Sequence, residues 1–182
     1  KDDGSVVTWG GDDYGGDSSK VSRQISSGVK KVYANDKAFA ALKDDGSVVT
    51  WGHIEYGGNA YDCGGSGCIN APANSLDNGV VRVFATKYAF AALKSDGSVV
   101  TWGHNAKGGN SSAVNLTNVA EIYYNDNAFA AVKNDQTVVT WGAASYGANS
   151  NTVYGGSLDS VVSITATQYA FAALKSNGSV VT

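Results

Sequence analysis

The chain has 182 residues, with 23 glycines, one proline, no methionine and a formal net charge of −3. A mildly acidic chain offers no basic face to neutralise phosphates, so we expect no nucleic-acid partner. No run approaches the roughly 20 apolar residues that a membrane-spanning helix needs, so we expect no membrane span. The many Gly, Ser, Thr, Asn and Asp residues favour short strands joined by turns over long helices.

One phrase, close to K-x-D-G-S-V-V-T-W-G, occurs five times along the chain. Its copies begin at Lys1, Lys43, Lys94, Lys133 and Lys175. A period of about 40 residues is typical of repeat architectures, in which each unit buries its apolar surface against its neighbours. We therefore treat residues 1–182 as a single repeat array, and we expect it to be a segment of a longer array or assembly. Its units are 1–42, 43–93, 94–132 and 133–174, with a partial unit at 175–182.

The first eight residues carry the repeated phrase alone. They match residues 175–182, and we expect both segments to be the second strand of the same hairpin. A propeller that closes with a shared blade needs terminal fragments that complement each other, whereas these duplicate each other. We therefore expect an open arc or a window on a longer array. Its terminal strands should then pair with equivalent repeats or protomers, because an exposed edge rich in Val is a template for another strand.

Three strands are predicted in each complete unit, in chain order. The first follows V-x-x-V-x-A, with copies at 29–34, 80–85, 119–124 and 161–166. The second follows A-F-A-A-L, with copies at 38–42, 89–93, 128–132 and 170–174. The third is the V-V-T-W-G end of the repeated phrase. Asp-Gly or Asn-Gly stands between the last two strands in three copies and tolerates the positive φ of a tight hairpin turn: Asp45-Gly46, Asp96-Gly97 and Asn177-Gly178.

The A-F-A-A-L strand is apolar on both faces. Phe39 and Ala41 point to one side of the sheet, and Ala40 and Leu42 point to the other. A strand buried on both sides, with alanine at alternate places, favours sheets packed closely face to face. The predicted fold class is therefore all-β, with tandem repeats of about 40 residues that form propeller-like blades or an open stacked-β arc.

A Trp-Gly pair and a Gly-rich loop follow each hairpin. The four tryptophans resemble the ligand-stacking ladders of carbohydrate binders, but a Trp at one place in every unit is more often a packing anchor between neighbours. We favour packing between repeats, and the residues assigned to it are Trp9, Trp51, Trp102, Trp141, Phe39, Phe90, Phe129 and Phe171. The loop tyrosines Tyr14, Tyr56 and Tyr146 leave open a glycan-binding alternative.

The order V-x-x-V-x-A, then A-F-A-A-L-K-x-D-G-S-V-V-T-W-G, then Y-G-G resembles the repeats of the regulator of chromosome condensation superfamily. The likeness is strongest to its short-repeat secreted type, which includes a propeller-type β-lactamase inhibitor protein. The resemblance implies a β-propeller, usually seven-bladed, that binds other proteins through loops on one face. Two departures stand out: Y-G-G replaces the G-Q-L-G loop motif, and residues such as Lys37 and Tyr88 replace the usual His. The resemblance therefore implies the fold more than the function.

Cys63 and Cys68 are the two cysteines of the chain, and they enclose only four residues. Glycines between them give the flexibility that disulfide geometry requires, so we predict an intramolecular disulfide and an oxidising compartment. A zinc site would need two further ligands, and neither His53 nor His104 has a familiar spacing to the pair. We therefore expect no metal.

Other polar residues are weaker candidates for a site. His53 and His104 occupy the same variable position after Trp-Gly, which indicates a surface feature. The acidic stretch 11–17 resembles Gly-Asp calcium loops, but it occurs once and lacks regular ligand spacing, so turn chemistry explains it. No Ser-His-Asp, Cys-His or paired-carboxylate arrangement emerges from the sequence. We expect no enzymatic activity, no catalytic residues and no cofactor.

Three N-x-S/T sequons begin at Asn110, Asn115 and Asn177. Together with the cysteine pair they favour export and covalent glycans. The leading functional hypothesis is a non-enzymatic extracellular or cell-surface scaffold, as in a filament, appendage or matrix, that assembles with equivalent repeats. The alternatives are part of a closed seven-bladed propeller that binds or inhibits a protein ligand, and a glycan-binding lectin.

Overall fold

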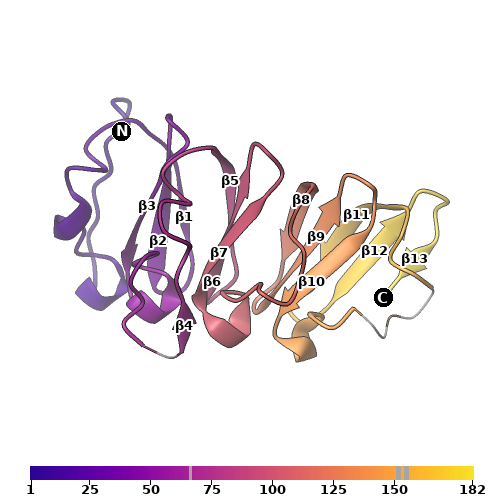
Figure 1. The fold of residues 1–182 in the computed structure, drawn as a ribbon. Helices are drawn as coiled ribbons and strands as arrows, with labels where there is room; N and C mark the ends of the chain where they lie inside the picture. Colours follow the sequence, from indigo (N-terminus) through magenta and orange to yellow (C-terminus); the bar gives the residue numbers. More distant parts are fainter. Residues whose placement is uncertain (66, 151–152, 154–155) are drawn as a thin grey trace.

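The computed structural model describes residues 1–65, 67–150, 153 and 156–182. It confirms the all-β prediction: four small antiparallel sheets follow one another along the chain, and the chain ends lie at opposite sides of the array (Figure 1). Among the described residues, two short 3-10 helices precede the first sheet and three more lie between successive sheets. No helix among the described residues is long and apolar enough to cross a membrane.

Each sheet is built from the three predicted strands, and the second sheet has one strand more. The sheet orders are β1-β2-β3, β5-β6-β7-β4, β8-β9-β10 and β11-β12-β13. The strands are β1 (Val29–Ala34), β2 (Ala38–Lys43), β3 (Val48–Gly52), β4 (Cys68–Ile69), β5 (Val80–Ala85), β6 (Ala89–Lys94), β7 (Val99–His104), β8 (Val119–Tyr124), β9 (Ala128–Lys133), β10 (Val138–Gly142), β11 (Val161–Ala166), β12 (Phe171–Lys175) and β13 (Val180–Val181). The 3-10 helices are η1 (Asp12–Tyr14), η2 (Ser19–Val21), η3 (Ile54–Tyr56), η4 (Asn105–Lys107) and η5 (Ala144–Tyr146).

The predicted hairpin joins the second and third strands of each sheet. In the first sheet Phe39 lies opposite Trp51. At the turn, Gly46 has a φ of 78° and donates its N–H to the Lys43 carbonyl at 3.0 Å. The Asp45 carboxylate accepts the Ser47 N–H at 2.9 Å and the Ser47 hydroxyl at 2.6 Å. The positive φ expected at the Asp-Gly and Asn-Gly turns is thus confirmed.

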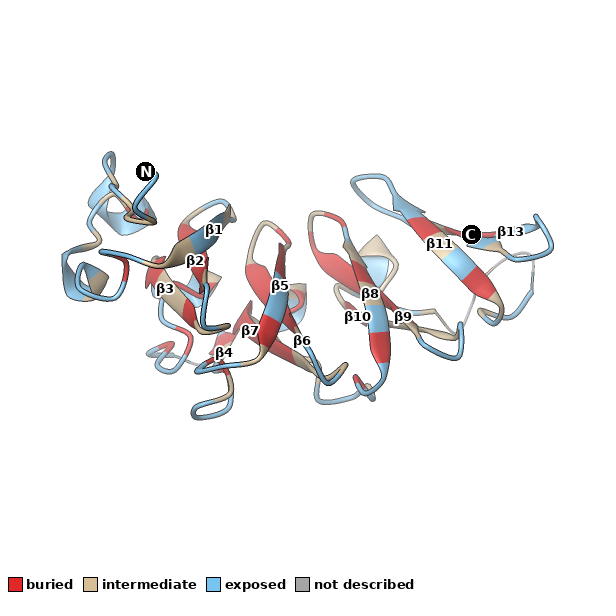
Figure 2. Ribbon diagram, turned by 90° about the horizontal axis from the view of Figure 1, so that it is seen from above, coloured by how far each residue is buried: buried red, intermediate tan, exposed pale blue. Residues whose placement is uncertain are grey.

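Neighbouring sheets pack face to face through the alternating alanines. Ala40 and Leu42 of β2 share a core cluster with Phe90 and Trp102 of the second sheet. The opposite face of β6, through Ala89 and other small residues, packs against the third sheet. Figure 2 shows this burial as red strand segments in the successive sheets. Because alanine projects little from the sheet, two sheets approach closely enough to exclude water between them.

Backbone hydrogen bonds also link the sheets. The Val80 N–H donates to the Gly46 carbonyl at 2.9 Å, so the turn of one sheet holds the first strand of the next. Val119 and Val161 repeat this bond with Gly97 and Gln136 at 2.9 and 3.0 Å. The repeat therefore stacks through main-chain as well as side-chain contacts, which fixes the position of each sheet relative to its neighbour.

The structure of the first 28 residues differs from the sequence prediction, which expected a strand at residues 1–8. Residues 1–8 form no β-strand, because no A-F-A-A-L segment lies beside them. Instead Val6, Val21 and Ile25 cover the outer face of the first sheet around Ala41 and Trp51. At the other end the predicted hairpin is present, since β13 pairs with β12.

Candidate functional site

Two kinds of segment meet along one edge of the sheet array. One is the turn between the first and second strands of a sheet, such as 35–37. The other is the 3-10 helix that follows Trp-Gly. Figure 1 shows η3, η4 and η5 in a row along the lower edge. Because every unit contributes both segments, side chains at these positions recur across the whole array.

A polar residue at the start of each turn ties the two segments together. The Asn35 Oδ1 accepts the N–H groups of Lys37 and Ala38 at 3.0 and 2.8 Å, and its Nδ2 donates to the Tyr56 carbonyl at 2.7 Å. Asn125 repeats the arrangement with the Tyr146 carbonyl at 2.7 Å. In the second sheet the Thr86 hydroxyl takes the same role. These side chains satisfy turn N–H groups and fix the residues that follow.

The residues held in this way form a continuous row of aromatic and cationic side chains, which we call the ladder. Its members, in spatial order, are Tyr14, Lys37, Tyr56, Tyr88, Lys107, Tyr146 and Tyr169.

Every neighbouring pair in the ladder is in contact range. The Lys37 Nζ lies 5.5 Å from the Tyr14 ring centre and 4.8 Å from that of Tyr56. The Tyr56 and Tyr88 ring centres are 5.2 Å apart. The Lys107 Nζ lies 6.0 Å from the Tyr88 ring centre and 5.5 Å from that of Tyr146. Tyr146 and Tyr169 complete the row at 5.1 Å. Cation–π attraction and tilted ring contacts therefore run through all the units.

The two histidines flank the middle of the ladder. His53 meets Tyr56 edge-on, with ring centres 5.2 Å apart, and His104 meets Tyr88 at 6.0 Å. Equivalent positions after Trp-Gly are thus close to the row, although they lie 51 residues apart in sequence. The sequence predicted a surface position for them and did not predict this neighbourhood.

A polar groove of about 510 Å³ runs beside the ladder. It is lined by the tips of the same turns in all four sheets: Ala34–Asp36, Ala85–Lys87, Tyr124–Asp126 and Ala166–Gln168. The Lys87 Nζ lies 2.7 Å from the Asp126 carboxylate. Their hydrogen bond raises the pKa of Lys87 and lowers the pKa of Asp126. The Lys87 N–H also donates to the Asp126 carbonyl at 3.0 Å, so the groove is braced across two sheets.

The tryptophans hold the 3-10 helix loops against the following sheet. The Trp102 indole is fully buried and stacks on Phe90 with ring centres 5.3 Å apart. Its Nε1–H donates to the Gly57 carbonyl at 3.1 Å, and Gly57 directly follows Tyr56 of the ladder. Trp51 and Trp141 form the same bond with Gly15 and Gly108 at 3.1 Å. The structure thus places three of the four tryptophans, with their stacked phenylalanines, between units.

Trp9 contradicts the packing assignment. It is 85% exposed, because the described residues provide neither a stacked phenylalanine nor a loop carbonyl beside it. Phe171 is only partly buried. The packing role is therefore limited to units that have a described neighbour on the relevant side.

No protein-family model matches this sequence, and no curated protein matches it. Solved structures do match. The ectodomain of the receptor kinase CR4 from Physcomitrella patens gives a TM-score of 0.54 at 18% identity, over 85% of this chain and 40% of that one. Human WBSCR16 gives 0.52 at 18% identity, over 84% and 47%. Yeast RCC1 (Prp20), solved bound to Kap60, gives 0.52 at 19% identity, over 84% and 41%.

This chain has an RCC1-like β-propeller repeat fold. It spans less than half the length of each of these three proteins. The likeness confirms the fold implied by the repeated phrase. At these sequence identities the likeness shows the fold alone. It does not assign the activities or partners of those proteins to this chain.

Within the RCC1-like fold, the 51-residue repeat carries the disulfide. Cys63 and Cys68 are bonded to each other, with Cα atoms 6.0 Å apart. Cys68 opens β4, which pairs along the outer edge of β7. The bond therefore closes a loop that covers a sheet edge.

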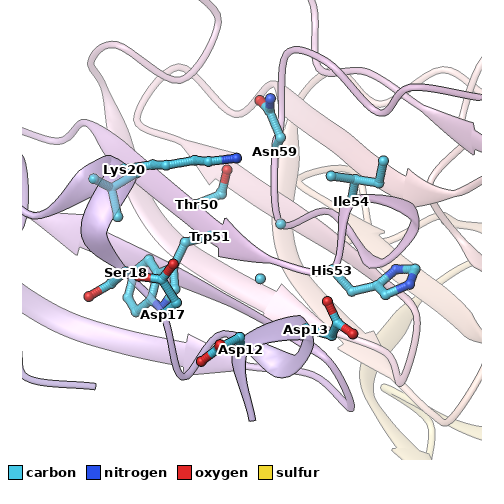
Figure 3. Close-up of a pocket in the computed structure, with 13 residues that line it drawn as sticks. Asp12, Asp13, Asp17, Ser18, Lys20, Thr50, Trp51, His53, Ile54 and Asn59 are labelled. Atoms are coloured by element: carbon cyan, nitrogen blue, oxygen red, sulfur yellow. The ribbon is translucent and has the colours of Figure 1, made fainter. Parts of the chain in front are cut away.

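The acidic stretch lines a pocket of about 570 Å³ between the N-terminal segment and β3 (Figure 3). Asp17 accepts the Ser19 N–H at 2.8 Å, as turn chemistry predicts. No three His, Cys, Asp or Glu side chains gather as metal ligands in the described part of the chain.

The sequon asparagines occupy surface loops of the fold. Asn115 and Asn177 are exposed, and each accepts hydrogen bonds from the residue two positions on. Asn110 is partly buried, and its Nδ2, the atom that carries a glycan, donates to Asn105 at 3.0 Å. Asn115 and Asn177 are thus the more accessible acceptors.

Sequence reasoning singled out Tyr14, Tyr56 and Tyr146 and missed the other ladder members. Tyr14, Tyr56, Lys107 and Tyr146 share one repeat position. Lys37, Tyr88 and Tyr169 share a second position, just before the second strand. The signal that was available is that the first position holds tyrosine or lysine in all four units, and the second holds them in three, with Asn127 in the other. Only the three-dimensional arrangement shows that the two positions interleave into one row.

Proposed function

We propose that this chain is a non-enzymatic interaction scaffold that binds a partner protein across the ladder and the adjoining groove. The observation that carries this proposal is the continuity of the ladder, which crosses every boundary between sheets without a break. Packing between the sheets does not require this continuity of the ladder, since the buried alanines and tryptophans already hold the sheets together.

The chemistry of the ladder suits protein recognition. Tyrosine offers a large, amphipathic contact area at a low entropy cost, because it has few rotatable bonds. Lys37 and Lys107 add positive charge at two places along the row. The turn asparagines fix the backbone beneath these side chains, so little ordering remains to oppose binding.

Similar structures support a protein partner. Yeast RCC1 (Prp20) was solved bound to Kap60, and the work on Prp20p from Saccharomyces cerevisiae describes binding to Gsp1p and histones. Those partners belong to those proteins. What carries over to this chain, as a proposal, is that loops at one edge of an RCC1-like array hold another protein.

We also propose an extracellular or cell-surface location, as in a filament or matrix. The Cys63–Cys68 disulfide supports an oxidising compartment, and the matched CR4 structure is an ectodomain. In the end sheet, Leu174 and Val180 are exposed, whereas the corresponding Leu93 and Val99 are more deeply buried. Equivalent repeats, in a longer chain or in another copy, would cover this surface. Glycans on Asn115 and Asn177 belong to the same proposal.

The direct test is capture of proteins from the extracellular fraction of the source organism. The double variant Tyr56→Ala with Tyr88→Ala should lose a set of proteins that the wild type retains. Tyr61→Ala is the matched control, because Tyr61 is an exposed tyrosine of the same loop outside the ladder. Equal capture by the wild type and the double variant, with unchanged melting temperatures, would contradict the proposal.

The glycan-binding alternative rests on the same tyrosines, of which Tyr14 and Tyr169 are each 55% exposed. Binding on a glycan array that disappears with Tyr14→Ala, Tyr56→Ala and Tyr146→Ala would favour this alternative over a protein partner. A closed seven-bladed binder, in turn, requires a polypeptide with three more units whose ends complement each other.

A further inference from the structure

The outer edge of one sheet already carries an added strand. β4 pairs antiparallel with the end of β7, with Cys68 opposite His104 and Ile69 opposite Gly103. The Asn105 N–H donates to the Gly67 carbonyl at 2.9 Å and extends the pairing by one bond. β4 comes from the loop between the first and second sheets, so the chain covers this edge with its own insert.

The corresponding edge of the first sheet has no such strand. The repeat places Gly52, His53 and Ile54 at the positions of Gly103, His104 and Asn105. β3 pairs only with β2 among the described residues. The Ile54 N–H corresponds in the repeat to the Asn105 N–H, which bonds to Gly67. Among the described residues, the Ile54 N–H has no backbone or side-chain acceptor.

A pocket occupies the place where the missing strand would lie. Residues Thr50–Ile54 form one wall of the 570 Å³ pocket, and residues 12–21 contribute the opposite wall (Figure 3). In the second sheet the insert fills the equivalent space. A Cβ on Gly64 would lie 2.9 Å from the Ile54 side chain, and one on Gly67 would lie 3.9 Å from the Glu55 carboxylate. Ile54 and Glu55 are the repeat equivalents of Asp12 and Asp13.

We propose that this pocket binds an extended peptide segment of another protein, which pairs antiparallel with residues 52–54 as β4 pairs with β7. Addition of a strand to a free sheet edge is a general mode of peptide recognition, in which the main chain supplies affinity and flanking side chains supply specificity. The pocket carries Asp12, Asp13 and Asp17 against a single lysine, Lys20. The bound segment is therefore one with lysine or arginine beside a short apolar centre.

The chain's own insert supplies the probe for a test. A fluorescein-labelled peptide of sequence Lys-Gly-Ala-Ile-Asn-Ala-Lys copies residues 67–71, with alanine in place of Cys68 and a lysine at each end. The same peptide with glutamate at both ends is the charge control. Fluorescence anisotropy gives the two dissociation constants at low salt, and we expect the lysine peptide to bind more tightly.

Substitutions at Ile54 separate strand addition from a charge effect. Ile54→Pro removes the N–H, and proline suits the first position of a helical turn. His53 has φ −67° and ψ 126°, which is the extended conformation favoured before proline. Ile54→Ala keeps the N–H and is the matched control. Loss of one hydrogen bond should make the dissociation constant of Ile54→Pro roughly five-fold higher than that of Ile54→Ala, because both variants lack the isoleucine side chain and only the proline lacks the N–H.

NMR shift mapping locates the bound peptide and completes the test. The proposal requires that the amide shifts of Thr50–Ile54 and Asp12–Asp17 move, with Ile54→Pro folded by its melting temperature. It is overturned if neither peptide binds, if the two Ile54 variants bind alike, or if the shifts lie around Tyr88 and Tyr146 instead. Because neither Tyr56 nor Tyr88 lines the pocket, failure here leaves the capture experiment with those two residues unaffected.

Discussion

The Trp102 indole donates a 3.1 Å hydrogen bond to the carbonyl of Gly57, which belongs to the loop before the sheet of Trp102. Gly57 follows Tyr56 in the chain, so one bond connects the buried core of a sheet to the ladder on the surface. Trp51 and Trp141 repeat the bond in their own sheets. Repeat-to-repeat packing and the geometry of the candidate binding face therefore depend on the same residues.

Trp102→Ala should strongly destabilise the chain, because it removes a fully buried indole and leaves a cavity between two sheets. The expected loss is about 3–5 kcal/mol in the free energy of unfolding, measured by chemical denaturation. Trp9→Ala is the control, since Trp9 is exposed, and its effect should stay within about 0.5 kcal/mol. Similar losses for both variants would show that Trp102 is not a packing anchor.

Gly57→Ala should also destabilise the chain, for a combined steric and backbone reason. Gly57 has a φ of 87°, and an added Cβ would lie 2.8 Å from Trp102. Gly178 has a similar φ of 83° with no atom within 4 Å of the added Cβ. Gly178→Ala therefore reports backbone strain of about 1–2 kcal/mol alone. We expect Gly57→Ala to cost at least about 1 kcal/mol more than this control, and equal costs would rule out the close packing on Trp102.

Gln136→Gly should stabilise the chain. Gln136 has a φ of 64° at the hairpin position that Gly46, Gly97 and Gly178 hold elsewhere. A left-handed conformation costs an L-residue about 1–2 kcal/mol, and part of this is offset by the greater entropy of glycine in the unfolded chain. Thermal melting should show a gain of up to about 1 kcal/mol. A lower melting temperature would mean that the Gln136 side chain makes a stabilising contact.

The repeated turns predict how stability depends on acid pH. Hydrogen bonds from the hydroxyl and N–H of Ser47 hold the pKa of Asp45 below its ordinary value of 3.8, and Asp96 and Asp135 have the same arrangement. A carboxyl whose pKa is lower in the folded state stabilises the fold above its unfolded pKa. That contribution is lost as pH falls through the folded pKa.

A triple variant with asparagine at these three aspartates checks the effect. Asn177 shows that asparagine fits the turn, where it accepts the Ser179 N–H at 3.0 Å and hydroxyl at 2.7 Å. The melting temperature of the variant should fall less than that of the wild type between pH 5 and pH 2, a window chosen around the ordinary aspartate pKa. Identical pH profiles would show that the turn carboxylates do not contribute to the loss of stability in acid.

Much of the fold could be predicted from the sequence, because the repeat exposes it. The first strand of every sheet, Val29–Ala34 in the first, has the bounds that V-x-x-V-x-A predicts. The alternation of Phe39 and Ala40 predicted a strand buried on both faces. Residues 1–8 have the sequence pattern of a strand but do not form one. A strand needs a neighbouring strand to pair with, and the residue pattern of one segment does not show whether such a neighbour is present.

The candidate site was less accessible to sequence reasoning. Tyr56 and Tyr88 lie 32 residues apart in the chain and at different repeat positions, yet their rings are 5.2 Å apart. Their contact depends on how one sheet is placed against the next, which no local pattern encodes. The strand pairing of Cys68 with β7 was hidden for the same reason, since the insert occurs in one unit and its two-residue strand has no periodicity.

Solvent exchange of the four indole N–H protons tests whether the sheets hold the loops of the ladder, because each indole N–H gives its own NMR signal. We expect slow exchange for Trp51, Trp102 and Trp141, whose indoles are buried and bonded to loop carbonyls, and fast exchange for the exposed Trp9. Equally fast exchange at all four indoles would contradict this expectation, because the loops that carry the ladder would then not be held by the sheets that follow them.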